Sequence, residues 1–211
     1  MSTWTSKPAR RLCRALALAL AVAGPAVAED SAPRAVSVSQ GGLVVTGPSG
    51  YCVDMHASRD GTAGAFVLFG TCAALSGKSG FGRPSRPGVL TASVIDGAPA
   101  EGIASLLPEM AAFFATPAGK RALSRSGNPE TVELRGSYIE GTTLYLDIVD
   151  RAASAQRVAP GYWRAVLALN GRTVSLSVMS LADDPLGESE KRRLLQSFVA
   201  RMKSANGAGL F

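Results

Sequence analysis

The sequence is poor in the residues that carry most enzyme chemistry. Its 211 residues include one histidine and three cysteines, and aromatic residues make up 6%. A serine hydrolase needs a histidine beside its nucleophile, so His56 is the one candidate base. A metal site needs several converging His, Cys or carboxylate ligands. Asp147 and Asp150, or Asp183 and Asp184, could bind calcium weakly, but neither pair has the regular acidic spacing of a calcium loop, so we expect solvated surface carboxylates. We therefore expect no catalytic residue, no metal site and no cofactor.

Negative charge is absent from the first 28 residues. Their basic residues precede a small apolar run at 15–23, and Ala26-Val27-Ala28 then offers a small-residue cleavage pattern. The run is about half of the roughly 20 residues needed to span a bilayer. We expect residues 1–28 to be a signal peptide cleaved after Ala28, and the protein to be periplasmic or secreted. No later segment is long and apolar enough to cross a membrane.

Removing this segment changes the charge balance. Four of the 22 basic residues leave with it and none of the 16 acidic ones, so 18 basic residues face 16 acidic ones and the net charge is +2. This balance gives no support for nucleic-acid binding. The remaining length suits one domain at 41–211 after a flexible leader at 29–40.

Only Cys52 and Cys72 remain after cleavage, and an even count in an oxidising compartment indicates a disulfide. Residues 51–55 and 65–72 are typical of strands, and they flank a turn-rich link at 58–62. A hairpin centred on Thr62 would place Cys52 opposite Cys72, at a separation that a disulfide accepts.

Strands and helices follow in groups. Residues 89–95 are typical of a strand, and a helical apolar face then runs from Ile103 to Phe114, interrupted by Pro108. The break predicts a kink or two consecutive short helices. Thr116-Pro117 is typical of a helix start. Strands are expected at 131–139 and 142–149, without a fixed register.

The clearest hairpin joins strands at 162–169 and 172–179 through Asn170-Gly171, a favoured two-residue turn. Pairing Leu169 with Arg172 makes one face apolar, and that face carries Trp163. A helix is expected at 188–206, and its expected buried stripe is Leu194, Leu195, Phe198, Met202 and Ala205.

Strands in hairpins with helices between and after them predict an α+β domain with a mainly antiparallel sheet, packed against amphipathic helices and held by one disulfide. The strands, the Asn170-Gly171 hairpin and the final helix, over about residues 88–206, resemble the PsbP-like α/β/α domains of the thylakoid lumen and bacterial envelope. The resemblance implies an accessory or scaffolding role outside the cytoplasm.

The glycine- and proline-rich segment 76–88 is the main candidate for contact with a partner. It carries Lys78, Phe81, Arg83 and Arg86, which could reach an envelope protein or an anionic envelope component. Ser76-Gly77-Lys78-Ser79 resembles the end of a nucleotide-binding loop, but Cys72 stands where the first glycine should be, so no nucleotide is expected.

Three functions remain open. The first is an exported, non-enzymatic accessory or binding protein of the cell envelope. The second is an extracytoplasmic hydrolase using His56 and a neighbouring carboxylate, because Asp54 and His56 would share a strand face. The third is a carrier with an apolar pocket between the sheet and the helix that bears Phe113 and Phe114.

Overall fold

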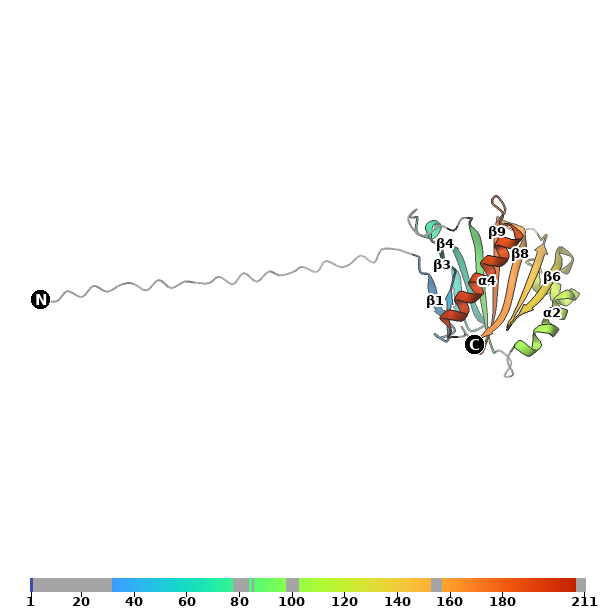
Figure 1. Cartoon of the computed structure of the whole chain (residues 1–211), viewed down its shortest axis with the longest axis horizontal. Helices are drawn as coiled ribbons and strands as arrows, with labels where there is room; N and C mark the ends of the chain where they lie inside the picture. Colours follow the sequence, from blue (N-terminus) through green and yellow to red (C-terminus); the bar gives the residue numbers. More distant parts are fainter. Residues whose placement is uncertain (2–31, 78–83, 85, 98–102, 153–156, 208–211) are drawn as a thin grey trace.

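A seven-stranded antiparallel sheet forms the centre of the protein, in the order β3-β4-β5-β9-β8-β7-β6, and β1 and β2 form a separate antiparallel pair. The computed structural model describes residues 1, 32–77, 84, 86–97, 103–152 and 157–207. The long helix α4 crosses one face of the sheet diagonally, and α2 lies beside β6 (Figure 1). The α+β fold class predicted from the sequence is confirmed.

The strands are β1 Ala35–Val38, β2 Leu43–Thr46, β3 Tyr51–Gly61, β4 Gly64–Thr71, β5 Gly88–Asp96, β6 Val132–Glu140, β7 Thr143–Asp150, β8 Val158–Leu169 and β9 Arg172–Leu181. The α-helices are α1 Cys72–Ser76, α2 Leu107–Ala115, α3 Pro117–Leu123 and α4 Glu188–Ala205, with 3₁₀ turns η1 Ala104–Leu106 and η2 Pro129–Thr131. Thus β1 lies inside the expected flexible leader.

Each face of the sheet has its own apolar core. Successive side chains of a strand point to opposite faces. In β8, Trp163 and Ala165 join the core beneath α4, whereas Tyr162 and Val166 join the core beneath α2 and α3. Phe198 of α4 packs edge-on against a β4 phenylalanine at a ring distance of 5.4 Å. The two cores fix α4 and the α2–α3 pair on opposite sides of the sheet.

The β8–β9 hairpin has the predicted register. Leu169 pairs with Arg172, and Trp163 pairs with Val178. Asn170 and Gly171 both have positive φ, at 50° and 71°, as a two-residue type I′ turn requires. The alternation of apolar residues and the two turn residues were therefore enough to predict the register of this hairpin.

The β3–β4 hairpin corrects one prediction. Cys52 pairs with Gly70 and not with Cys72, because the register shifts between Asp54 and Arg59. Cys72 is the first residue of α1, outside the strand. The predicted disulfide nevertheless forms, with the two Cα atoms 4.8 Å apart.

Side chains hold the extra residues of β3 in place. The Asp54 carboxylate accepts the backbone N–H groups of His56 and Ala57, at 3.0 and 3.1 Å. The Ser58 hydroxyl donates to the Asp54 carbonyl and accepts the Leu68 N–H. These bonds replace ladder bonds across the shift, so the strand continues to Gly61 where a turn was expected.

The helices follow the predicted breaks. Pro108 lies in the first turn of α2, so the apolar stretch forms η1 and then α2 rather than one kinked helix. Thr116 caps α3, its hydroxyl accepting the Gly119 N–H at 3.1 Å.

The buried stripe of α4 was predicted in part. In α4, Leu195, Phe198 and Met202 are buried as expected. Ala205 is exposed, contrary to prediction, and Val199 takes a place in the buried stripe. Within the described part of the chain, none of the helices has the length and apolar character to span a membrane.

Candidate functional site

Of the residues predicted to contact a partner, Arg86 can be placed. Its Nη1 donates to the Pro185 carbonyl at 3.3 Å and to Glu190 Oε2 at 3.4 Å. Lys78, Phe81 and Arg83 lie outside the described residues. Arg86 therefore joins the segment before β5 to the start of α4, which is far away in the sequence.

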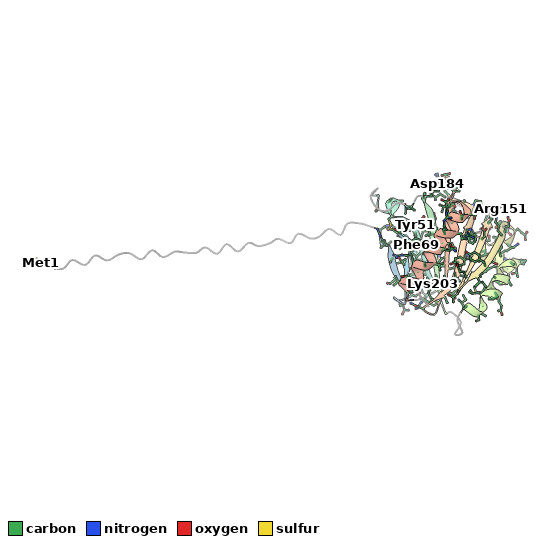
Figure 2. The ribbon with its side chains drawn as sticks, viewed as in Figure 1. Met1, Tyr51, Phe69, Arg151, Asp184 and Lys203 are labelled. Atoms are coloured by element: carbon green, nitrogen blue, oxygen red, sulfur yellow. A yellow bond between two sulfur atoms is a disulfide. The ribbon has the colours of Figure 1, made fainter. Side chains whose placement is uncertain are left out.

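A groove of about 280 Å³ opens at this point. It is lined by Tyr51, Pro84, Arg86, Leu186, Glu190, Arg193 and Leu194. These residues come from the start of β3, the segments before β5 and α4, and the first half of α4. Figure 2 shows Tyr51 near α4, between Phe69 and the Asp184 end of the domain. We call this set the Arg86 groove.

The first half of α4 builds one wall of the Arg86 groove. Glu190, Arg193 and Leu194 are three and four residues apart, so their side chains share a helix face. Glu190 Oε2 also accepts the Gly187 N–H at 2.8 Å, which caps the helix start. Its carboxylate is thereby fixed where Arg86 reaches it. Arg193 is exposed and makes no ion pair with any residue that the structure describes.

Tyr51 forms the buried end of the Arg86 groove. Only 1% of its surface is exposed, and its hydroxyl accepts the Gly88 N–H at 3.1 Å. Burial raises the pKa of Tyr51, although the Gly88 bond works in the opposite direction. The phenol is therefore neutral at physiological pH and keeps its own proton. Within the described ranges, no residue accepts that proton.

The disulfide lies next to Tyr51. Cys52 is joined to Cys72, and the Cys72 N–H donates to the Gly50 carbonyl at 2.9 Å. These two links tie the start of β3 to α1, from which the segment 76–88 continues. The disulfide thus fixes the start of β3, which carries Tyr51, relative to α1.

His56 lies at a different and larger hollow of about 400 Å³, together with Asp54, Met55 and Ser76. Asp54 and His56 were expected to share a strand face, which would allow a hydrogen bond between their side chains. The structure instead shows the Asp54 carboxylate bonded to the backbone N–H of His56 and Ala57, in the irregular part of β3. The hydrolase hypothesis thus lacks the expected contact between the carboxylate and the imidazole.

A second polar group lies along the opposite flank of α4 and was missed from the sequence. Glu188 accepts the Trp163 indole N–H at 3.1 Å and the Lys191 ammonium at 2.8 Å. Burial alone would raise the pKa of Glu188, but these bonds outweigh it and lower that pKa. Lys191 is only 3% exposed. The i,i+3 spacing of Glu188 and Lys191 was the signal in the sequence, but the sequence did not show that Lys191 is buried.

The tyrosines of β6 and β7 extend this flank. The rings of Tyr138 and Tyr145 stack at 4.8 Å, and Trp163 meets Tyr138 edge-on at 6.1 Å. Burial, followed by the charge of Glu140, raises the pKa of Tyr145 to about 12. Trp163 therefore faces the apolar side, as predicted, and its polar edge is satisfied by Glu188.

The acidic residues weighed for calcium do not converge. Asp150 is fully buried and pairs with Arg125 at 3.2 Å, so it is not the solvated carboxylate that we expected. Asp147 lies on the other face of β7, and Asp183 and Asp184 are exposed before α4. Among the residues that the structure describes, no three His, Cys, Asp or Glu side chains gather as metal ligands.

The phenylalanines considered for an apolar carrier pocket lie on α2. Phe114 packs against the second core, and Phe113 is 46% exposed, with a ring distance of 5.6 Å between them. Neither lines the Arg86 groove or the hollow at His56.

Comparison with known proteins gives little further guidance. No protein-family model matches the chain, and no curated protein matches it. Among solved structures, the chain is similar to the Ran-binding protein Mog1p of Saccharomyces cerevisiae, with a TM-score of 0.41 and 11% identity. That similarity covers 84% of this chain and 93% of the yeast protein. At this identity and score, the likeness carries no information about what this chain binds.

Proposed function

We propose that this chain is an exported, non-enzymatic accessory or binding protein of the cell envelope, and that it contacts its partner through the Arg86 groove. The observation that carries the proposal is the position of Arg86. This residue comes from the segment predicted to contact a partner, and it lines a groove together with Arg193 and Tyr51. A concave site with a few polar groups among apolar walls is the usual form of a binding site.

Two features support export. The first 28 residues have the charge and hydropathy pattern of a signal peptide. The Cys52–Cys72 bond is of the kind that persists in oxidising compartments and is rare in the cytosol. The resemblance to PsbP-like domains points to the same accessory role outside the cytoplasm and forms part of this proposal.

The binding role is favoured over hydrolysis because of the environment of His56. Its neighbouring carboxylate, Asp54, is engaged by two backbone N–H groups. A general base is normally oriented by a hydrogen bond from a third group to its ring. The imidazole of His56 makes no such bond to any described residue, and it lies on an exposed stretch of β3.

The test is native isolation of the protein with crosslinking and mass spectrometry of what accompanies it. Arg86→Gln should lower recovery of the partner about tenfold, as expected for loss of an interface arginine. His56→Ala should leave recovery unchanged. Arg201→Gln, which removes the same charge from the exposed far end of α4, is the matched control. Neutralising Lys78, Arg83 and Arg86 together should have the largest effect.

The same samples test export directly. We expect the isolated protein to begin at Glu29 and to contain no free thiol. A protein recovered from the cytoplasm with both cysteines reduced would contradict the proposal. A hydrolytic activity that is lost in His56→Ala would favour the alternative function.

A further inference from the structure

We propose that the Arg86 groove binds an oxyanion group, a phosphate or a carboxylate, between Arg86 and Arg193 with the Tyr51 hydroxyl as a third donor. This inference rests on the proposed function and names the chemistry of the ligand. It follows from the charge of the groove, from a donor that has no acceptor, and from the size of the space.

The charges that line the groove do not cancel. Arg86 is paired with Glu190 at 3.4 Å, whereas Arg193 has no described acidic partner. Glu190 Oε2 accepts both Arg86 and the Gly187 N–H. One positive charge is left over. Guanidinium groups bind carboxylates and phosphates through paired hydrogen bonds, so an anion with one negative charge would complete the set.

Tyr51, the most buried residue of the lining, adds a donor. Its hydroxyl oxygen is occupied by the Gly88 N–H, so a ligand can use only its O–H hydrogen. A buried hydroxyl with an unused proton is costly unless something accepts that proton. Arg86, Arg193 and the Tyr51 hydroxyl therefore supply the side-chain donors of the groove, against the single carboxylate of Glu190. This excess of donors and of positive charge selects for an oxyanion rather than a cation.

The remaining walls restrict what can carry the anion. Leu186 and Leu194 contribute apolar surface, and the space is about 280 Å³. This volume fits an anionic group with a short apolar or polar stem. A free phosphate or a phospholipid headgroup meets this description, and the experiment separates these two sources.

The experiment is an NMR titration of the purified, disulfide-bonded protein, following backbone amides and arginine side chains. The probes are inorganic phosphate and acetate, each compared with chloride at equal ionic strength. Vesicles of phosphatidylglycerol are compared with vesicles of phosphatidylcholine by co-sedimentation. We expect saturable shifts at Gly88, Arg86 and Arg193 with phosphate or acetate if the anion is bound free. Binding to phosphatidylglycerol vesicles alone would assign the anion to a lipid headgroup.

Arg193→Gln is the decisive variant, because Arg193 is exposed and its replacement should not disturb folding. It should weaken binding of the effective probe about tenfold. Arg192→Gln is the matched control, since it removes the same charge one residue away and does not line the groove. Tyr51→Phe should also weaken binding, in a sample whose unfolding curve shows that it remains folded.

Two results would overturn the inference. One is the absence of saturable binding with all of these probes, and the other is an equal loss in the Arg192 and Arg193 variants. If either occurs while the exported protein still recovers its partner in an Arg86-dependent way, the proposed function stands and the oxyanion site does not. Cytoplasmic, reduced protein would instead remove the proposed function itself.

Discussion

Two aspartates on the same strand, three residues apart, have opposite environments. Asp150 is fully buried on the α3 side of β7 and accepts the Arg125 and Ala152 backbone N–H groups at 2.7 and 2.9 Å. Burial alone would raise the pKa of Asp150, but these bonds and those from Thr131 and the Arg125 side chain outweigh it and lower that pKa. The charged carboxylate of Asp150 therefore stabilises the fold through these hydrogen bonds.

Asp147 lies on the α4 side of the same strand and is partly exposed. Its Oδ1 is enclosed and has no hydrogen-bond partner among the described residues. Burial, followed by the negative charge of Glu188, raises the pKa of Asp147. The contrast teaches that burial does not decide what a carboxylate does for a fold. A buried carboxylate stabilises the folded protein when enough hydrogen-bond donors reach it, and destabilises the folded protein when they do not.

The largest expected effect is the loss of Asp150. Asp150→Ala leaves the Arg125 and Ala152 amides without their acceptor and should lower the free energy of unfolding by about 3 kcal/mol at pH 7. Because the pKa of Asp150 is lowered on folding, its contribution is present above its unfolded pKa. That contribution is lost as pH falls through the lower folded pKa. Urea unfolding should show that the difference in the free energy of unfolding between variant and parent becomes smaller below about pH 4. An unchanged midpoint at pH 7 would contradict this assignment.

An intermediate effect is expected from Glu188, which connects Trp163 of β8 to the buried Lys191. Glu188→Gln should cost about 1 to 2 kcal/mol, less than breaking a fully buried pair, because the Glu188 side chain is 50% exposed and solvent screens it. It should also lower the pKa of Asp147 toward its ordinary value, since a like charge has been removed. A carboxyl carbon titration by NMR measures both groups. Glu190→Gln, on the same helix but facing Arg86, should leave the Asp147 pKa unchanged.

These environments mark how far the sequence could lead. The Asn170-Gly171 hairpin was predicted with its register, because the turn residues and the alternation are local. The register shift in β3 was not predicted. It depends on hydrogen bonds of the Asp54 and Ser58 side chains, which replace backbone hydrogen bonds between the strands. The disulfide was predicted correctly from the even number of cysteines left after the expected cleavage, although the register argument used for it was wrong.

The candidate site was predicted only at one residue. Arg86 was identified from the composition of its segment, but the groove needs Tyr51 and Arg193, which are distant from it in the sequence. The spacing of Glu190, Arg193 and Leu194 places them on one helix face, yet nothing local says that this face meets Arg86. Asp147 and Asp150 were likewise both predicted to be solvated carboxylates. The alternation of a strand predicts the face on which a side chain lies, but it does not predict which hydrogen-bond donors lie on that face.

The smallest expected effect has the opposite sign. Asp147→Asn should stabilise the protein at pH 7, because the raised pKa of Asp147 means that its charged form is disfavoured on folding. The pKa of Asp147 is higher in the folded protein than in the unfolded chain, so its protonated form stabilises the fold. This contribution is complete when the pH is below the unfolded pKa, and it is lost as the pH rises through the folded pKa. We expect a gain of about 0.5 kcal/mol, kept small by solvent screening. Urea unfolding at pH 7 and pH 3 should show the gain at the higher pH and none at the lower. A loss of stability at pH 7 would mean that the charged form of Asp147 stabilises the fold, through its electrostatic attraction to Arg135 and Lys191.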